Sequence, residues 1–134
     1  MFDKLIIGVT NDNNKDTMFS IDERAKMIDN AISQHKNVSV HTFKGLLMDF
    51  AESENAIVII RGLRVLSDFE YEFKMALMNR NLNNQVTTLF MMPHEKYTHI
   101  SSSLVKEVAS LGGDVSAYVP QHVEDALQES FSGK

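Results

Sequence analysis

The sequence predicts an α/β protein with a Rossmann-like parallel sheet and helices on both of its faces. Short apolar runs rich in β-branched residues alternate along the chain with amphipathic segments of helical length, an order typical of βαβ units. Right-handed crossovers between parallel strands place the helices on both faces of the sheet. Hydrophobic residues form 43% and charged residues 23% of the 134 residues, which is typical of a globular domain.

Four segments are expected as strands because each is a short apolar run bounded by polar residues or glycine. The run Ala56–Ile60 is apolar throughout, which predicts a strand buried on both faces, as in parallel sheets. The expected strands are Lys4–Val9, Val38–Phe43, Ala56–Ile60 and Val86–Met91.

Five segments are expected as helices, and two of them begin with the spacing of a capping box. Ser20 is followed by Glu23, and Ser67 is followed by Glu70. The expected helices run from Ser20 to about Gln34, from Leu46 to about Ser53, from Ser67 to about Asn81, from Ser101 or Ser102 to Ser110, and from Pro120 to near Ser130. Gly112 and Gly113 are expected to close the fourth helix, and Pro120 suits the first turn of the last.

Composition restricts the classes of function. The net charge of −5 argues against a general nucleic-acid binder. The chain has no cysteine, which excludes disulfides and thiolate metal sites. No apolar stretch is long enough for a membrane span and no signal-peptide pattern opens the chain, so we expect a cytoplasmic protein that does not bind membranes. Without a linker-like segment, residues 1–134 are expected to form a single domain.

The hydroxyl run Ser101–Ser103 is expected at the beginning of a helix. The unpaired N–H groups of a helix start, together with its dipole and hydroxyl donors, can bind a phosphate. Alternatively, the run is an ordinary serine cap with polar neighbours.

Arg61 and Arg64 directly follow the expected strand Ala56–Ile60. Ligands of open α/β sheets bind at the carboxyl ends of the strands, and arginine is suited to two-point recognition of phosphate. Alternatively, the two arginines form solvated pairs with acidic residues such as Asp68 or Glu70. Two phosphate-type motifs on one sheet favour a nucleotide site.

Four spaced motifs, together with a C-terminal pattern, resemble bacterial phosphopantetheine adenylyltransferase over the whole chain. They are Ile59–Arg64, Asp68–Glu72, Met78–Arg80 and Ile100–Val108, followed by Gly113–Val115 and Val119–Pro120. The resemblance implies transfer of the adenylyl group of ATP to 4′-phosphopantetheine, which gives dephospho-coenzyme A and pyrophosphate. It also implies Mg²⁺ with the ATP, dephospho-coenzyme A or coenzyme A as further ligands, and a homo-oligomer, which is a hexamer in the family.

The resemblance also assigns site residues. Lys15 and Arg64 are expected to be catalytic, and Lys15, Leu47 and Arg61 to bind the acceptor substrate. The expected ATP-binding residues are Gly62, Leu63, Arg64, Glu72, Tyr97, Thr98, His99, Ile100, Ser101, Ser102 and Ser103. No residue is expected as a protein ligand of a metal.

Three of these residues also have ordinary structural interpretations. Lys15 is otherwise a solvated loop lysine. Leu47 is otherwise a core residue of an amphipathic helix. Glu72 is otherwise a helix-surface acid paired with Lys74 or Arg80.

One feature of the family is absent: the chain contains no Gly-His pair. The family carries that pair in a loop after its first strand, and Met1–Asp3 resembles the end of its first helix. We therefore expect an N-terminally incomplete chain that lacks the family's central strand and has severely impaired turnover. Two alternatives are a nucleotidylyltransferase with another acceptor, and a non-catalytic fragment that binds a ligand or oligomerises.

Overall fold

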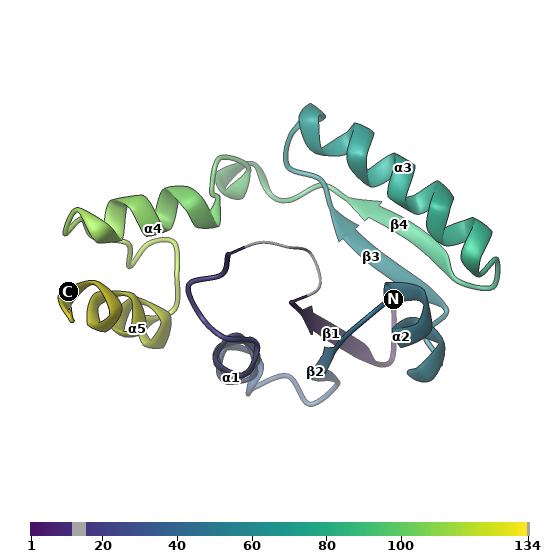
Figure 1. Ribbon diagram of the computed structural model, residues 1–134, viewed down its shortest axis with the longest axis horizontal. Coiled ribbons are helices and arrows are strands. Elements are labelled where there is room, and N and C mark those ends of the chain that lie inside the picture. The colour runs from purple at the N-terminus through teal and green to yellow at the C-terminus, as the bar shows by residue number, and fades with distance from the viewer. Residues whose placement is uncertain (12–15, 134) are drawn as a thin grey trace. The chain divides into compact units, whose positions relative to one another are not determined.

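The computed structural model describes residues 1–11 and 16–133, with the side chains of residues 66 and 67 excepted. The chain divides into two compact units, Met1–Lys44 with Ile100–Lys134, and Gly45–His99. Each unit contains one βαβ element with parallel strands (Figure 1). The predicted class is therefore confirmed, because parallel strands alternate with helices that flank them.

In the first unit, strand β1 (Leu5–Thr10) pairs with β2 (Val38–Phe43), and helix α1 (Ile21–Ile32) connects them. The register runs from Leu5 opposite Val38 to Thr10 opposite Phe43. The predicted capping box is confirmed: Glu23 N donates to Ser20 Oγ over 3.2 Å, and Ser20 N donates to a Glu23 carboxylate oxygen over 2.7 Å.

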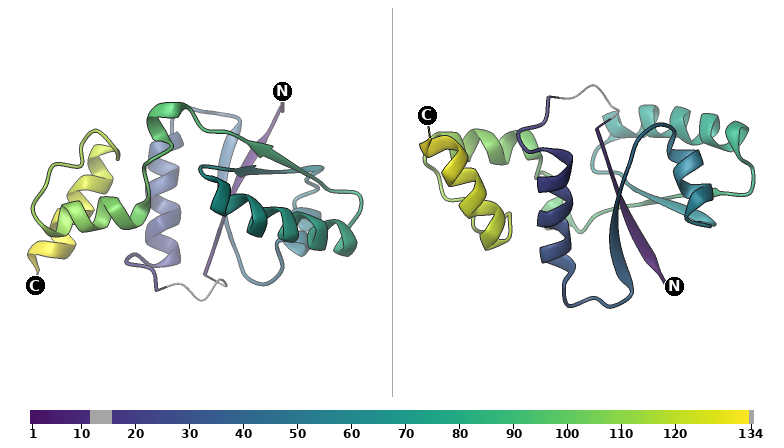
Figure 2. Two further views of the ribbon diagram at one scale, coloured as in Figure 1. Left: turned by 90° about the horizontal axis from the view of Figure 1, so that it is seen from above. Right: turned by 60° about the horizontal axis from the view of Figure 1, so that its bottom comes forward.

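The core of the first unit lies between helices α4 (Ser102–Ser110) and α5 (Gln121–Ser132), which lie side by side (Figure 2). Val105, Val115 and Leu127 form the buried cluster. On α5, Nε2 of His122 lies 2.8 Å from the carbonyl oxygen of Met27 on α1, which links these two helices.

The second unit contains helix α2 (Leu47–Ser53), strand β3 (Val58–Gly62), helix α3 (Leu66–Leu82), strand β4 (Thr87–Met91) and a 3₁₀ turn, η1 (Glu95–Tyr97). Strands β3 and β4 pair in parallel, from Val58 opposite Thr87 to Gly62 opposite Met91. Met48, Ala51 and Val86 form the buried cluster, against which Ala56 and Ile59 pack.

The four strands form two separate two-stranded sheets in the described part of the chain. The prediction that the run Ala56–Ile60 is a strand buried on both faces is therefore wrong. Strand β3 begins two residues later and includes Arg61 and Gly62, while Ile57 is 71% and Ile60 is 36% exposed. A parallel strand is buried on both faces only where helices cover both faces of its sheet, and the exposed side chains of Ile57 and Ile60 lack that cover.

The predicted start of α3 is also wrong. The helix begins at Leu66 with Val65 as its N-cap, and no side chain caps it. Ser67 thus lies inside the helix, and the carboxylate of Glu70 accepts a hydrogen bond from Lys74 instead.

The end of α4 in the first unit agrees with the prediction. Gly112 and Gly113 follow the helix, and Gly112 has a φ of 78°. None of the helices in the described ranges is long and apolar enough to cross a membrane.

Gly113 is required for close packing after α4. A Cβ atom at this position would lie 2.5 Å from Cγ1 of Val108 and 3.0 Å from the Val108 carbonyl oxygen, which accepts the Gly113 N–H. Overpacking of this kind costs about 1–3 kcal/mol. We therefore expect Gly113→Ala to lower the free energy of unfolding by about that amount in urea denaturation.

Gly133→Ala is the matched control for this experiment. Its Cβ would meet its nearest atom, the Glu129 carbonyl oxygen, at an ordinary distance of 3.5 Å. This variant should unfold at the same urea concentration as the parent chain. Equal stability of the Gly113→Ala variant and the control would contradict the packing at Val108.

Candidate phosphate-binding site

Arg61 lies within strand β3, and Arg64 follows it. Arg61 is opposite Phe90 in the register, and Gly62 is opposite Met91. The backbone N–H of Leu63 donates to the carbonyl oxygen of Met91 over 2.9 Å, so the ladder continues one residue beyond the strand. The arginines are thus held at the carboxyl end of a short parallel sheet, where α/β proteins bind ligands.

The guanidinium of Arg61 is joined to the carboxylate of Glu72 on α3 at two points. Nε donates to Oε2 over 2.9 Å and Nη2 donates to Oε1 over 2.6 Å. The hydrogen bond from Arg61 to Glu72, helped by the charge of Glu72 and opposed by burial, raises the pKa of Arg61 above its ordinary value. Arg61 is therefore a permanent cation at neutral pH.

Acidic residues near the two arginines were the alternative interpretation, and the structure confirms part of it. Arg64 Nε lies 3.6 Å from a carboxylate oxygen of Asp68 in an i,i+4 pair on a solvated surface. Glu70 pairs with Lys74 over 2.8 Å rather than with an arginine. The expectation that Glu72 pairs with Lys74 or Arg80 is wrong, because its partner is Arg61.

Two residues expected to approach a ligand have room around them. A Cβ added at Gly62 would meet no atom within 4 Å, so no neighbouring side chain requires glycine here. Leu47 is the first residue of α2 and is partly exposed, whereas Met48 and Ala51 of the same helix form the core. The ordinary interpretation of Leu47 as a buried core residue is therefore wrong.

Tyr97 ends the 3₁₀ turn η1, which sequence patterns did not predict. Nζ of Lys96 lies 4.6 Å from the centroid of the Tyr97 ring, within cation–π distance. The ring of His94 meets that of Tyr97 edge to face with centroids 6.3 Å apart. Thr98 is partly exposed and His99 exposed, so Tyr97–His99 present an aromatic and polar segment at the surface of the second unit.

The hydroxyl run lies at the beginning of α4 in the first unit, as predicted. Ser101 is the N-cap, and its Oγ accepts a hydrogen bond from the N–H of Leu104 over 3.2 Å. Ser102 and Ser103 are exposed in the first turn, and Ile100 packs against the apolar core of the unit. The capping interpretation thus applies to Ser101, and the anion interpretation stays a prediction for Ser102 and Ser103.

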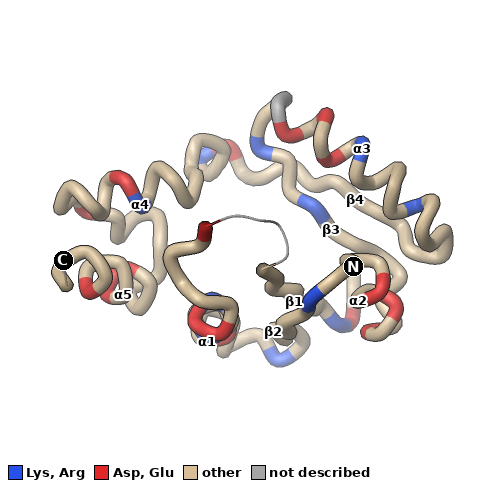
Figure 3. The backbone as a smooth tube through the Cα atoms, in the orientation of Figure 1, with Lys and Arg blue, Asp and Glu red and all other residues tan. Residues whose placement is uncertain are grey.

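The predicted site residues are distributed over both units. Leu47, Arg61–Arg64, Glu72 and Tyr97–His99 belong to the second unit, and Ile100–Ser103 to the first. Lys15 lies outside the described residues. Figure 3 shows a basic residue on β3 and a mixture of acidic and basic residues along α3, so that phosphate binding there would depend on individual cations.

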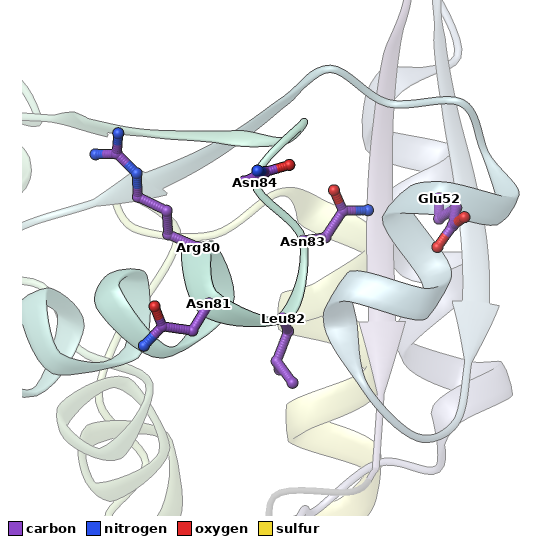
Figure 4. Close-up of a pocket in the computed structure, with 6 residues that line it drawn as sticks. All are labelled: Glu52, Arg80, Asn81, Leu82, Asn83 and Asn84. Carbon is purple, nitrogen blue, oxygen red and sulfur yellow. The ribbon is translucent and has the colours of Figure 1, made fainter.

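A polar depression at the end of α3 was not predicted from the sequence. Its lining is shown in Figure 4 and consists of Glu52, Arg80, Asn81, Leu82, Asn83 and Asn84. It contains none of the predicted site residues. Asparagines and an exposed arginine in the last turn of α3 and the loop after it form an ordinary polar surface, so a sequence pattern offers no signal for it.

The described residues do not form a metal site from protein side chains alone. Among them, no group of three or more histidine, aspartate or glutamate residues could hold a metal ion. Mg²⁺ is commonly held by one or two carboxylates together with the phosphates of its nucleotide. The described residues therefore do not supply a complete Mg²⁺ site by themselves.

Parallel strands that alternate with flanking helices define an α/β protein. Residues 1–108 match the model of the cytidylyltransferase-like family. The chain is 49% identical over 131 residues to a phosphopantetheine adenylyltransferase of Clostridium perfringens, covering 98% of this chain and 80% of the relative. For that of Geobacter metallireducens the identity is 48% over 132 residues, covering 98% and 81%. The chain belongs to the phosphopantetheine adenylyltransferases of the cytidylyltransferase-like family.

The two interpretations of the hydroxyl run predict different effects of substitution. Ser101→Ala removes the cap and is expected to lower the free energy of unfolding by about 1 kcal/mol. Ser103→Ala is the matched control, since Ser103 is exposed one residue inside the helix. It should leave the stability within about 0.5 kcal/mol of the parent. Urea denaturation measures both effects.

Calorimetry with ATP then tests the anion interpretation on the same variants. If Ser103 contacts a phosphate of ATP, the Ser103→Ala variant binds ATP more weakly while its stability is unchanged. If both variants retain the ATP affinity of the parent, Ser101 is a helix cap only and Ser103 contacts no phosphate of ATP.

Proposed function

We propose that the chain transfers the adenylyl group of ATP to 4′-phosphopantetheine, giving dephospho-coenzyme A and pyrophosphate, with turnover lowered by the absence of a Gly-His pair. The observation that carries this proposal is the identity of 46–49% to phosphopantetheine adenylyltransferases over 96–98% of the chain. The geometry supports it, because Arg61 and Arg64 lie at the end of a parallel sheet, where phosphate-bearing ligands bind.

In the proposed reaction, a phosphate oxygen of 4′-phosphopantetheine attacks the α-phosphorus of ATP in line with the leaving group. A bond forms between that oxygen and the α-phosphorus, and the bond from the α-phosphorus to the bridging oxygen breaks. The electron pair leaves with pyrophosphate. Such transfers depend on positioning and on stabilisation of developing negative charge.

The residues of this chain divide these tasks between them. Arg61 binds the phosphate of the acceptor, and Leu47 contacts its pantetheine arm. Arg64 and Lys15 balance charge at the reacting phosphates, and Gly62 and Leu63 approach ATP. Glu72 and the segment from Tyr97 to Ser103 complete the nucleotide site.

Mg²⁺ is part of the proposal as a companion of ATP. When bound, the ion would neutralise part of the charge on the triphosphate. Because the described residues do not form a metal cluster of their own, we assign no protein ligand to it.

Arg61 provides the test of the acceptor assignment. Arg61→Ala is expected to lower the affinity for 4′-phosphopantetheine at least tenfold, because a charged two-point contact is lost. The affinity for ATP should fall by less. Arg61→Lys should restore only part of the affinity because lysine lacks the planar fork. Calorimetry with each ligand measures both effects, and pyrophosphate release follows the reaction itself.

The outcome that contradicts the assignment is an equal loss of affinity for both ligands in the Arg61→Ala variant. Lys74→Ala is the control, since Lys74 is an exposed cation whose partner is Glu70. It removes the same charge from the second unit and should change neither affinity.

We also propose that the chain forms a homo-oligomer. The resemblance to the family implies that this oligomer is a hexamer. Large apolar side chains are exposed along α3 and β4, and the rings of Phe69 and Phe73 stack there with centroids 5.6 Å apart. Neighbouring exposed apolar side chains of this kind support an interaction surface. Its members are Phe69, Tyr71, Phe73, Met75, Leu77, Met78, Leu82, Leu89 and Met91, together with Met92 directly after β4.

Sedimentation velocity tests this proposal. We expect a species heavier than the 15.2 kDa chain that shifts towards the monomer in the variant Met78→Lys, because a buried unpaired charge opposes association. Leu111→Lys introduces the same charge at an exposed residue of the other unit and should leave the mass unchanged. A monomer at every concentration would refute the proposal.

A further inference from the structure

The pair between Arg61 and Glu72 differs from the other ion pairs of α3. Two nitrogen–oxygen contacts join it, and the side chain of Glu72 is only 13% exposed, compared with 46% for Arg61. The pair between Lys74 and Glu70 is a single contact between side chains that are 71% and 78% exposed. The carboxylate of Glu72 is thus the more sheltered partner, while the guanidinium still faces solvent.

A guanidinium has five N–H donors, arranged so that two neighbouring donors can bind two oxygens at once. Glu72 occupies the edge formed by Nε and Nη2. This is one of the edges that a phosphate would use. In the described part of the chain, Glu72 is also the acid that neutralises the charge of Arg61.

We propose that Glu72 competes with phosphate for Arg61 and thereby sets the affinity of this site for phosphate-bearing ligands. The inference rests on the proposed function, in which Arg61 binds the phosphate of the acceptor. Glu72 acts in two ways: it occupies one edge of the guanidinium, and its charge repels the incoming anion. A ligand gains the full interaction with Arg61 only by displacing the carboxylate or by adding contacts elsewhere.

An opposite role for Glu72 is to hold Arg61 in place and so strengthen phosphate binding. Two considerations favour competition. A phosphate carries nearly two negative charges at neutral pH. Its repulsion from a carboxylate a few ångström away is therefore almost twice that of a singly charged anion. The benefit of ordering is confined to the side chain, because the backbone of Arg61 is already paired with Phe90 in the strand ladder.

The sign of the effect in Glu72→Gln separates the two roles. Glutamine keeps the size of the side chain and removes its charge. Competition predicts that the affinity for inorganic phosphate rises about tenfold, as expected when a unit charge is removed beside a partly exposed dianion site. Ordering by Glu72 predicts that it falls. The probe is inorganic phosphate at constant ionic strength, followed by the Nε–H resonance of Arg61 in a nuclear magnetic resonance titration.

Glu70→Gln is the matched control. It removes one negative charge from the same helix and breaks the ion pair between Lys74 and Glu70, whose nitrogen–oxygen distance of 2.8 Å is close to the 2.6 Å between Arg61 and Glu72. Its phosphate affinity should stay within about twofold of the parent, because general electrostatic effects on a solvated surface are small. A rise equal to that in Glu72→Gln would overturn the inference by reducing it to net charge.

The parent chain supplies a measurement that does not depend on the folding of a variant. When phosphate saturates Arg61, the side-chain carboxyl carbon of Glu72 should shift, and that of Glu70 should not. Saturation of Arg61 with an unchanged Glu72 carboxyl resonance would overturn the inference. So would an unchanged or reduced affinity in a folded Glu72→Gln variant, or phosphate binding that survives Arg61→Gln.

Failure of the inference and failure of the proposed function are distinguishable. A rise in phosphate affinity in Glu72→Gln, together with no binding of 4′-phosphopantetheine and no formation of dephospho-coenzyme A by the parent, supports competition at Arg61 and refutes the proposed reaction. Formation of dephospho-coenzyme A together with an unchanged phosphate affinity in Glu72→Gln refutes the competition alone.

Discussion

The parallel pairing of the strands determines the rest of the structure. Two parallel strands cannot be joined by a tight turn, and each pair therefore requires a long crossover connection. Helices α1 and α3 are these crossovers, one in each unit. In the second unit α3 follows β3 after three residues. Its second turn carries Glu72 to Arg61, so the ion pair follows from the crossover geometry.

Local signals predicted most of the elements to within two residues. Strand β2 has the predicted bounds, and the capping box at Ser20 is present, because both depend on neighbouring residues. The burial of β3 was not predictable in the same way. Whether Ile57 and Ile60 are covered depends on what packs against the faces of the sheet that contains β3, and a run of apolar residues contains no information about that.

The same distinction applies to the candidate site. The pairs between Lys74 and Glu70 and between Arg64 and Asp68 are four residues apart on one helix or at its start, a spacing that sequence rules describe. Arg61 and Glu72 are eleven residues apart and lie on two different elements. The position of Arg61 at the end of a strand could be predicted from the sequence. The carboxylate that neutralises Arg61 could be identified only from the folded structure, in which α3 crosses back along β3.

Each strand in the described ranges pairs along one side, which leaves the other side of β1 without a neighbouring strand. Natural proteins protect such edges with lysine, proline or an irregular backbone. Leu5–Val9 contains neither a charged residue nor proline, whereas β3 carries Arg61. The backbone of β1 can therefore act as a template for an extended segment of another polypeptide, including a second β1. During concentration or storage, such pairing would join chains through β1, and the fraction of joined chains would depend on how the sample had been handled.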